Sequence, residues 1–156
     1  MPADVAGAVA MALRYASAAG LGVFAGANLT EGSVLVPYWR SLPPDGFFAW
    51  YRANDARLLG FFGPLTAVVA LATLAAAGAS FGAGDASRWW TLAASGLTFA
   101  AVAMFPLYFQ GANARFSAAS IPPDDLPGEL ARWAAWHRVR TVLAAAALAA
   151  GLVALR

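Results

Sequence analysis

The chain has 156 residues, of which 61% are hydrophobic and 12% charged, and it holds ten arginines, no lysine, one histidine and no cysteine. The hydrophobic fraction exceeds that of soluble domains, which is about half. The mean hydropathy of +0.63 likewise indicates a strongly apolar chain. The lack of cysteine excludes disulfides, thiolate catalysis, iron–sulfur clusters and c-type haem attachment, and a net charge of +2 excludes nucleic acid as an expected partner.

Most charged residues fall outside four apolar zones, which predict membrane-spanning helices at about 13–39, 58–79, 89–109 and 136–155. Each zone can cross a hydrocarbon core of about 30 Å as a helix that rises about 1.5 Å per residue. We therefore predict an all-α, integral membrane four-helix bundle with antiparallel up-down-up-down topology. Residues 1–156 form a single four-span transmembrane domain whose first partner is the lipid bilayer.

The first zone is glycine-rich and is interrupted near its end by Asn28, Thr30 and Glu31. It is too long for a signal-peptide core and follows no basic cluster, so we expect it to be retained. The stretch from Trp39 to Arg57 contains two prolines and a run of aromatic residues. Pro43-Pro44-Asp45 predicts a turn that can start a helix, and the rings and arginines of the loop predict an amphipathic segment that lies in the membrane interface.

A proline and two tryptophans in the third span predict its shape and its position in the membrane. Pro106 predicts a kink in the third span. Trp89 and Trp90 indicate an interfacial anchor at its start. After the breaker-rich stretch 121–128, Glu129 is expected to begin the helix that leads into the last span.

Arginines predict the orientation in the membrane. Seven of the ten lie on the side of the first and third connections, including Arg138 and Arg140 at the start of the fourth span, and three lie on the side of the termini. Because arginine accumulates in cytoplasmic loops, we expect loops 40–57 and 110–135 to be cytoplasmic and both termini to lie on the opposite side. The expected location is a bacterial inner membrane.

Polar side chains recur at helical spacing on three of the predicted spans. Trp133, Trp136, His137 and Arg140 share one face of the fourth helix, because they are separated by three, four or seven residues. Two more pairs are each three residues apart: Asn28 with Glu31 and Gln110 with Asn113. An antiparallel bundle brings these faces to one end, so the sequence predicts a shared polar site.

Each member of this set also has a structural explanation. Glu31 can form an ion pair inside the bundle, with Arg140 or Arg115 as its partner, and the carboxamides can form interhelical hydrogen bonds. A single histidine and one intramembrane carboxylate are too few ligands for zinc, non-haem iron or a di-iron site. No metal or other cofactor is therefore expected. Acid–base chemistry remains, with His137 as base, Arg140 as oxyanion partner and Asn113 as orienting group.

The stretch from Asn113 to Leu148 resembles the anthrone-oxygenase-like family of small four-helix membrane proteins, and looks closest to its bacterial branch. The shared features are Asn-Ala-Arg-Phe, an acidic proline-rich linker, and Arg-Trp-Ala-Ala-Trp-His-Arg-Val-Arg-Thr before an alanine-rich span. A Gly-Ala-Asn segment and Val-Leu-Val-Pro-Tyr-Trp-Arg in the first span extend the similarity over nearly the whole chain. Asn28-Leu29-Thr30-Glu31 departs from the fungal members, and much of the family is classed only as a domain of unknown function.

The resemblance implies oxygenation of anthrones to anthraquinones without metal or flavin, in which deprotonated carbon reacts with molecular oxygen. His137 and Arg140 would serve as base and oxyanion partner and Asn113 as positioner. We expect an anthrone-oxygenase-like monooxygenase that acts on a lipophilic aromatic or quinol-type substrate. The residues expected to bind this substrate are Asn28, Glu31, Gln110, Arg115, Trp133 and Trp136. The alternative is a non-catalytic membrane module that binds a lipid, a quinone or a partner subunit, and a homo-oligomer is left open.

Overall fold

The computed structural model describes the backbone of residues 3–156 and the side chains from Val5 onward, so Met1 and Pro2 of the predicted domain lie outside it. All regular structure in this range is helical, which confirms the predicted all-α fold. The elements are α1 (Ala3–Thr30), η1 (Glu31–Leu35), α2 (Val36–Ser41), α3 (Pro44–Gly82), α4 (Arg88–Met104), η2 (Phe105–Phe109), α5 (Gln110–Ser117), η3 (Pro123–Asp125) and α6 (Leu126–Val153).

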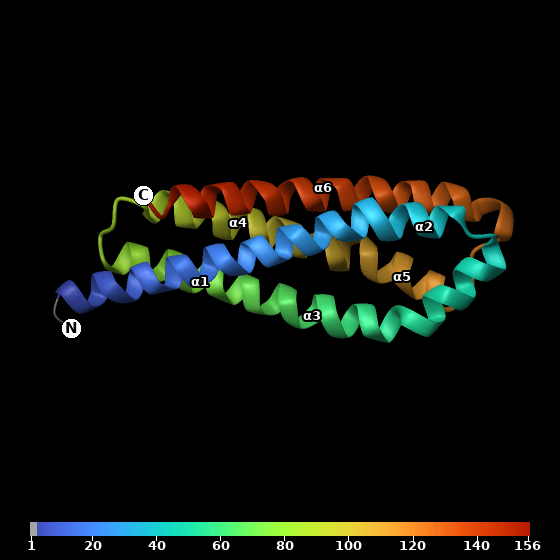
Figure 1. The fold of residues 1–156 in the computed structure, drawn as a ribbon, viewed down its shortest axis with the longest axis horizontal. Helices are drawn as coiled ribbons and strands as arrows, with labels where there is room; N and C mark the ends of the chain where they lie inside the picture. Colours follow the sequence, from blue (N-terminus) through green and yellow to red (C-terminus); the bar gives the residue numbers. More distant parts are fainter. Residues whose placement is uncertain (1–2) are drawn as a thin grey trace.

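The elements form four antiparallel arms, as predicted (Figure 1). α1, η1 and α2 make the first arm, α3 the second, α4 with η2 and α5 the third, and α6 the fourth. α1 and α4 each pack against both α3 and α6, so the arms close into a bundle. α1 begins and α6 ends at the same end of the bundle (Figure 1).

Three arms of the described chain are long and apolar enough to cross a membrane: Val5–Ser41, Pro44–Gly82 and Arg88–Ser117. The fourth predicted span, 136–155, lies mainly in α6, which does not join this set and carries two arginines and the histidine between 137 and 140. The apolar helices are thus compatible with an integral membrane protein.

The helix start indicated by Pro43-Pro44-Asp45 is confirmed, but the rest of the predicted loop over 40–57 is wrong, because α3 begins at Pro44 and continues unbroken to Gly82. Only Leu42 and Pro43 separate it from α2. Proline suits the first turn of a helix, since its missing N–H has no helical partner there. The aromatic residues of this stretch do not form a purely interfacial segment, because Phe47, Phe48 and Tyr51 are buried in the bundle.

Two π-helical turns interrupt the first and third arms. η2 begins next to Pro106, which accounts for the predicted distortion, because proline provides no N–H for the regular helical bond. η1 begins at Glu31, and the Val36 N–H bonds the Glu31 carbonyl five residues back. The fourth arm starts earlier than expected, since α6 begins at Leu126 rather than at Glu129.

The interior has two cores of different chemistry. The aromatic core contains large rings from every arm, with Trp39, Phe47, Phe109 and Trp133 almost fully buried. The alanine core lies towards the end that holds the termini and contains Leu21, Phe24, Val69, Ala94, Ala101, Ala144, Ala147 and Ala150. Two surface cavities lie beside the aromatic core, because residues of that core line both of them.

Candidate functional site

An ion pair between η1 and α6 forms the centre of the candidate site. The Arg140 Nη2 atom donates a hydrogen bond of 2.7 Å to Oε2 of Glu31. The two side chains are 13% and 6% exposed. Removing two charges from water is costly, so this pair must be compensated by its partners. Of the two partners predicted for Glu31, the structure selects Arg140.

His137 lies one turn before Arg140 on α6 and is 1% exposed. Its Nε2 atom is 2.9 Å from the carbonyl oxygen of Asn28, and its Nδ1 atom is 2.9 Å from Nη2 of Arg140. A carbonyl only accepts hydrogen bonds and a guanidinium only donates them. The ring is therefore neutral with its hydrogen on Nε2, and both of its nitrogens have partners.

The same ring also lies beside the carboxylate. Nδ1 of His137 is 3.5 Å from Oε2 of Glu31, the oxygen that Arg140 holds. The Thr141 hydroxyl donates to the His137 carbonyl at 2.9 Å and lies 3.4 Å from Nε2. Imidazole, carboxylate and guanidinium thus form one contiguous network, which we call the Glu31 network: Glu31, His137 and Arg140.

Gly32 permits the close approach of α6 to η1. A Cβ atom at this position would lie 3.1 Å from both Cδ2 and Nε2 of His137. About nine in ten real Cβ contacts are longer than this, so a side chain at this position would push the ring by a few tenths of an ångström. Glycine directly after Glu31 therefore sets the position of the imidazole.

Aromatic rings surround the network. Trp133 stacks on His137 with ring centroids 5.1 Å apart and an interplanar angle of 13°. The Arg140 guanidinium lies 4.3 Å from the centroid of the Phe109 ring and 6.0 Å from that of Phe62. A cation over a ring face is attracted by the ring quadrupole, so these rings partly replace water around Arg140.

Two buried polar atoms beside the network have no hydrogen-bond partner among the described residues. One is Oδ1 of Asn28, whose Nδ2 atom donates to the Phe24 carbonyl at 2.8 Å. The other is Nε of Arg140. Unpaired buried polar atoms are uncommon in folded proteins and often mark functional positions.

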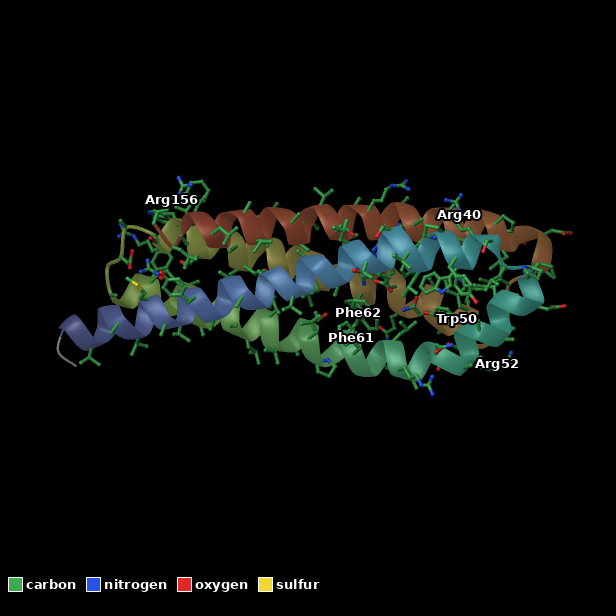
Figure 2. The ribbon with its side chains drawn as sticks, in the orientation of Figure 1. Arg40, Trp50, Arg52, Phe61, Phe62 and Arg156 are labelled. Carbon is green, nitrogen blue, oxygen red and sulfur yellow. The ribbon has the colours of Figure 1, made fainter. Side chains whose placement is uncertain are left out.

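A groove of about 410 Å³ opens next to the carboxylate, between α1 and α3. We call it the Glu31 groove. The labelled side chains Trp50, Phe61 and Phe62 lie between the first arm and α3 (Figure 2). Its walls combine one acid with apolar and polar groups: Ala27, Thr30, Glu31, Leu35, Trp50, Asn54, Arg57, Leu58, Phe61 and Phe62. A volume of this size suits a small molecule and is within the usual range for ligand sites.

The structure brings together five of the nine predicted site residues: Asn28, Glu31, Trp133, His137 and Arg140. A sixth, Asn113, reaches the site only through Trp133, because its Oδ1 atom accepts a bond of 3.0 Å from the indole Nε1. It therefore orients the ring that stacks on His137.

The other three predicted residues lie elsewhere. Arg115 pairs at 2.7 Å with Glu129, which also accepts bonds from Tyr108 and Arg132. Trp136 is 37% exposed and stacks on Tyr108, with centroids 5.0 Å apart. Gln110 is exposed and forms no side-chain hydrogen bond with a described residue. These three residues have the helical spacing expected of the site. Arg115 and Trp136 instead contact Glu129 and Tyr108, and Gln110 lies at the surface.

Sequence reasoning did not select several residues of the site: Gly32, Trp50, Asn54, Arg57, Phe62 and Phe109. Gly32 and Thr141 carry a local signal, because one adjoins Glu31 and the other follows His137 by one helical turn. Trp50, Asn54 and Arg57 were missed because the predicted loop concealed that they continue the helix of the second span alongside α1.

Comparison with models of known protein families, with curated proteins and with solved structures finds no match to the chain. The likeness to anthrone-oxygenase-like proteins therefore remains an expectation. What the chain can do must be inferred from the Glu31 network and the groove beside it.

Proposed function

We propose that the chain is a membrane enzyme that binds a lipophilic aromatic or quinol-type molecule in the Glu31 groove and deprotonates it for cofactor-independent oxygenation. One observation carries this proposal: a buried carboxylate, held by Arg140 and close to His137, forms part of the wall of an aromatic groove. Charged groups are expensive in such surroundings, and their retention beside a cavity favours a functional role.

The groove supports binding of a flat, mostly apolar molecule. Trp50, Phe61 and Phe62 provide ring faces, while Asn54 and Arg57 provide donors for phenolic or carbonyl oxygens. The groove lies on arms that are apolar enough to cross a membrane, so a lipophilic substrate can approach from the bilayer. This composition favours a substrate class and does not distinguish among its members.

Glu31 is the proton acceptor in this proposal. The predicted base, His137, has both nitrogens engaged and lies behind the carboxylate, whereas Glu31 is the member of the network that lines the groove. The imidazole Nδ1 is near enough to receive the proton from Oε2 once Arg140 withdraws from it. Arg140 then stabilises the remaining negative charge.

The reaction needs molecular oxygen as its oxidant. Glu31 removes a proton from an activated ring CH₂, and the carbanion forms a bond to one atom of O₂. The peroxide takes up the proton, and loss of water with the second hydrogen of the carbon leaves a carbonyl. One CH₂ and one O₂ thus give one C=O and one H₂O.

The test uses anthrone as substrate and purified protein in detergent, with oxygen uptake and anthraquinone absorbance as readouts. Glu31→Gln keeps the shape and should lower the rate at least about 100-fold, because proton transfer by a positioned base contributes about that much. The matched control is Glu129→Gln, which removes another carboxylate that is only 9% exposed and lies away from the groove. Equal rates for the two folded variants would refute the proposal.

A non-catalytic module that binds a lipid, quinone or partner subunit is the second candidate. It is favoured by the saturated hydrogen bonds of His137 and the short Arg140–Glu31 bond, which suit a structural network. In this case a quinone would quench the fluorescence of Trp50 without oxygen uptake, and Glu31→Gln would change stability alone.

We further infer a bacterial inner-membrane location with the arginine-rich end in the cytoplasm. Arg40 and Arg52 lie at one end of the bundle and Arg156 at the other (Figure 2). Because the chain has no cysteine, Arg52→Cys and Arg156→Cys each introduce a single thiol. An impermeant thiol reagent added outside spheroplasts should label the second variant and not the first, and the reverse would overturn the orientation.

A further inference from the structure

A second cavity, of about 200 Å³, lies on the other side of η1, between the first arm and α6. We call it the Arg40–Arg138 cavity. Its lining is Gly32, Val36, Pro37, Arg40, Ala134, His137 and Arg138. Both this cavity and the Glu31 groove are lined in part by residues of η1. The ring of His137, which belongs to the Glu31 network, also lines this cavity.

The charge of this cavity is entirely positive. Its lining contains two arginines and no acid. Neither Arg40 nor Arg138 forms an ion pair or side-chain hydrogen bond with any described residue, and both are exposed. By contrast, Arg14, Arg115, Arg132 and Arg140 each pair with a carboxylate. Two unpaired guanidiniums at one cavity form a matched pair of donors for an anion.

The anion that guanidiniums suit best is a phosphate, since the planar fork can donate two parallel hydrogen bonds to its oxygens. Three of the other lining residues are apolar: Val36, Pro37 and Ala134. A glycerol phosphate ester fits both kinds of lining residue, because its phosphate can bind the two arginines and its glycerol can contact the apolar residues.

One exposed apolar side chain lies a helical turn beyond the cavity on each of its two walls. Val142 follows Arg138 by one turn of α6 and is 66% exposed, and Leu29 precedes Gly32 by one turn and is 61% exposed. Both lie farther from the arginine-rich end than the cavity does. Acyl chains that begin at the cavity therefore have exposed side chains to pack against.

We propose that the Arg40–Arg138 cavity binds the phosphate of an anionic phospholipid, whose acyl chains run over Leu29 and Val142. The site is distinct from the Glu31 groove and does not depend on the function proposed for that groove. Anionic lipids are attracted to arginines at the cytoplasmic surface of membranes, which agrees with the orientation inferred above.

The test is native mass spectrometry of the protein in detergent, titrated with phosphatidylglycerol and, separately, with phosphatidylcholine. Removing one arginine near an anionic lipid should weaken binding about fivefold, so Arg40→Gln combined with Arg138→Gln should weaken phosphatidylglycerol binding by roughly 30-fold. The control combines Arg52→Gln with Arg156→Gln, which removes equal charge from α3 and from the far end (Figure 2) and should change binding less than about twofold.

Salt provides a second measurement, because screening at about 1 M ionic strength should abolish most of the preference for phosphatidylglycerol over phosphatidylcholine. Equal affinity of the two double variants, or equal binding of the two lipids by the unmodified protein, would overturn the proposal. Binding of soluble glycerol phosphate as tight as that of the lipid would overturn the assignment to a membrane lipid. Anthrone turnover plays no part in these outcomes.

Discussion

The two cores of the bundle differ in how closely they allow the helices to approach. In the alanine core, Ala94, Ala144 and Ala147 are 2% exposed or less, so small side chains bring α4, α6 and α1 together. Gly151 adds to this close contact, because a Cβ there would lie 3.0 Å from Leu21 Cδ1. Small residues at helix contacts are typical of membrane bundles.

The aromatic core packs with rings, and both cavities open beside it. Ring pairs such as Trp39–Trp133 and Phe47–Phe116, with centroids 5.2 and 5.1 Å apart, fill the space between the arms. Rings fill space less adaptably than alanines, so grooves remain on both sides of η1. We therefore expect binding and catalysis in the aromatic half of the bundle, and a purely structural role for the alanine half.

The largest predicted effect is in the aromatic half. Arg140→Met should lower the free energy of unfolding by about 3–5 kcal/mol, because it leaves Glu31 buried and unpaired. Adding Glu31→Gln should restore much of the loss. Unfolding in mixed detergent and denaturant measures both. The control is Arg132→Met, whose pair with Glu129 has a 64% exposed arginine and should cost less than about 1 kcal/mol; equal losses would contradict the prediction.

Leu21→Ala tests whether the alanine half is independent of the site. Leu21 is fully buried, so the cavity left by the substitution should cost about 2–5 kcal/mol. The chain has one histidine, and its imidazole resonances report directly on the Glu31 network. They should stay unchanged while the unfolding midpoint falls. A shift of these resonances would show that the two halves are coupled.

Two glycine substitutions compare the halves at matched contact distances. Gly32→Ala presents a Cβ to a ring that is held at both nitrogens, so it should strain the bond to the Asn28 carbonyl and cost about 1 kcal/mol. Gly151→Ala meets only the end of the flexible Leu21 side chain, and higher helix propensity offsets the contact by up to about 1 kcal/mol. Unfolding and the histidine resonances should both change for the first variant only.

The smallest predicted effect concerns Asp85, in the connection between α3 and α4. The Ser87 backbone N–H and, less strongly, Arg14 lower the pKa of this carboxyl below its ordinary value of 3.8. A lowered pKa in the folded state stabilises the protein above the unfolded pKa, and this stability is lost as pH falls through the folded pKa. Asp85→Asn should remove that part of the acid dependence. The measurement is the unfolding midpoint from about pH 5 to about pH 2, and identical profiles would refute it.

Much of the fold was predictable because it follows from composition and spacing. Four apolar zones imply four helices, and short connections make neighbouring helices antiparallel. The spacing of His137 and Arg140 also placed both on the face that meets Glu31. Pro43-Pro44-Asp45 indicated the start of α3, but its unbroken course to Gly82 was not predictable, because the rings that follow resemble an interfacial segment until their burial is known.

By itself, the sequence determined the helical class, the topology and the residues able to carry charge inside the bundle, because hydrophobicity and helical period are local properties of the chain. Tertiary structure alone decided that Glu31 pairs with Arg140 and that Arg115 pairs with Glu129. It also decided that Gly32 admits the His137 ring. These outcomes depend on the rotation and depth of each helix against its neighbours, which are set by packing among residues far apart in the chain.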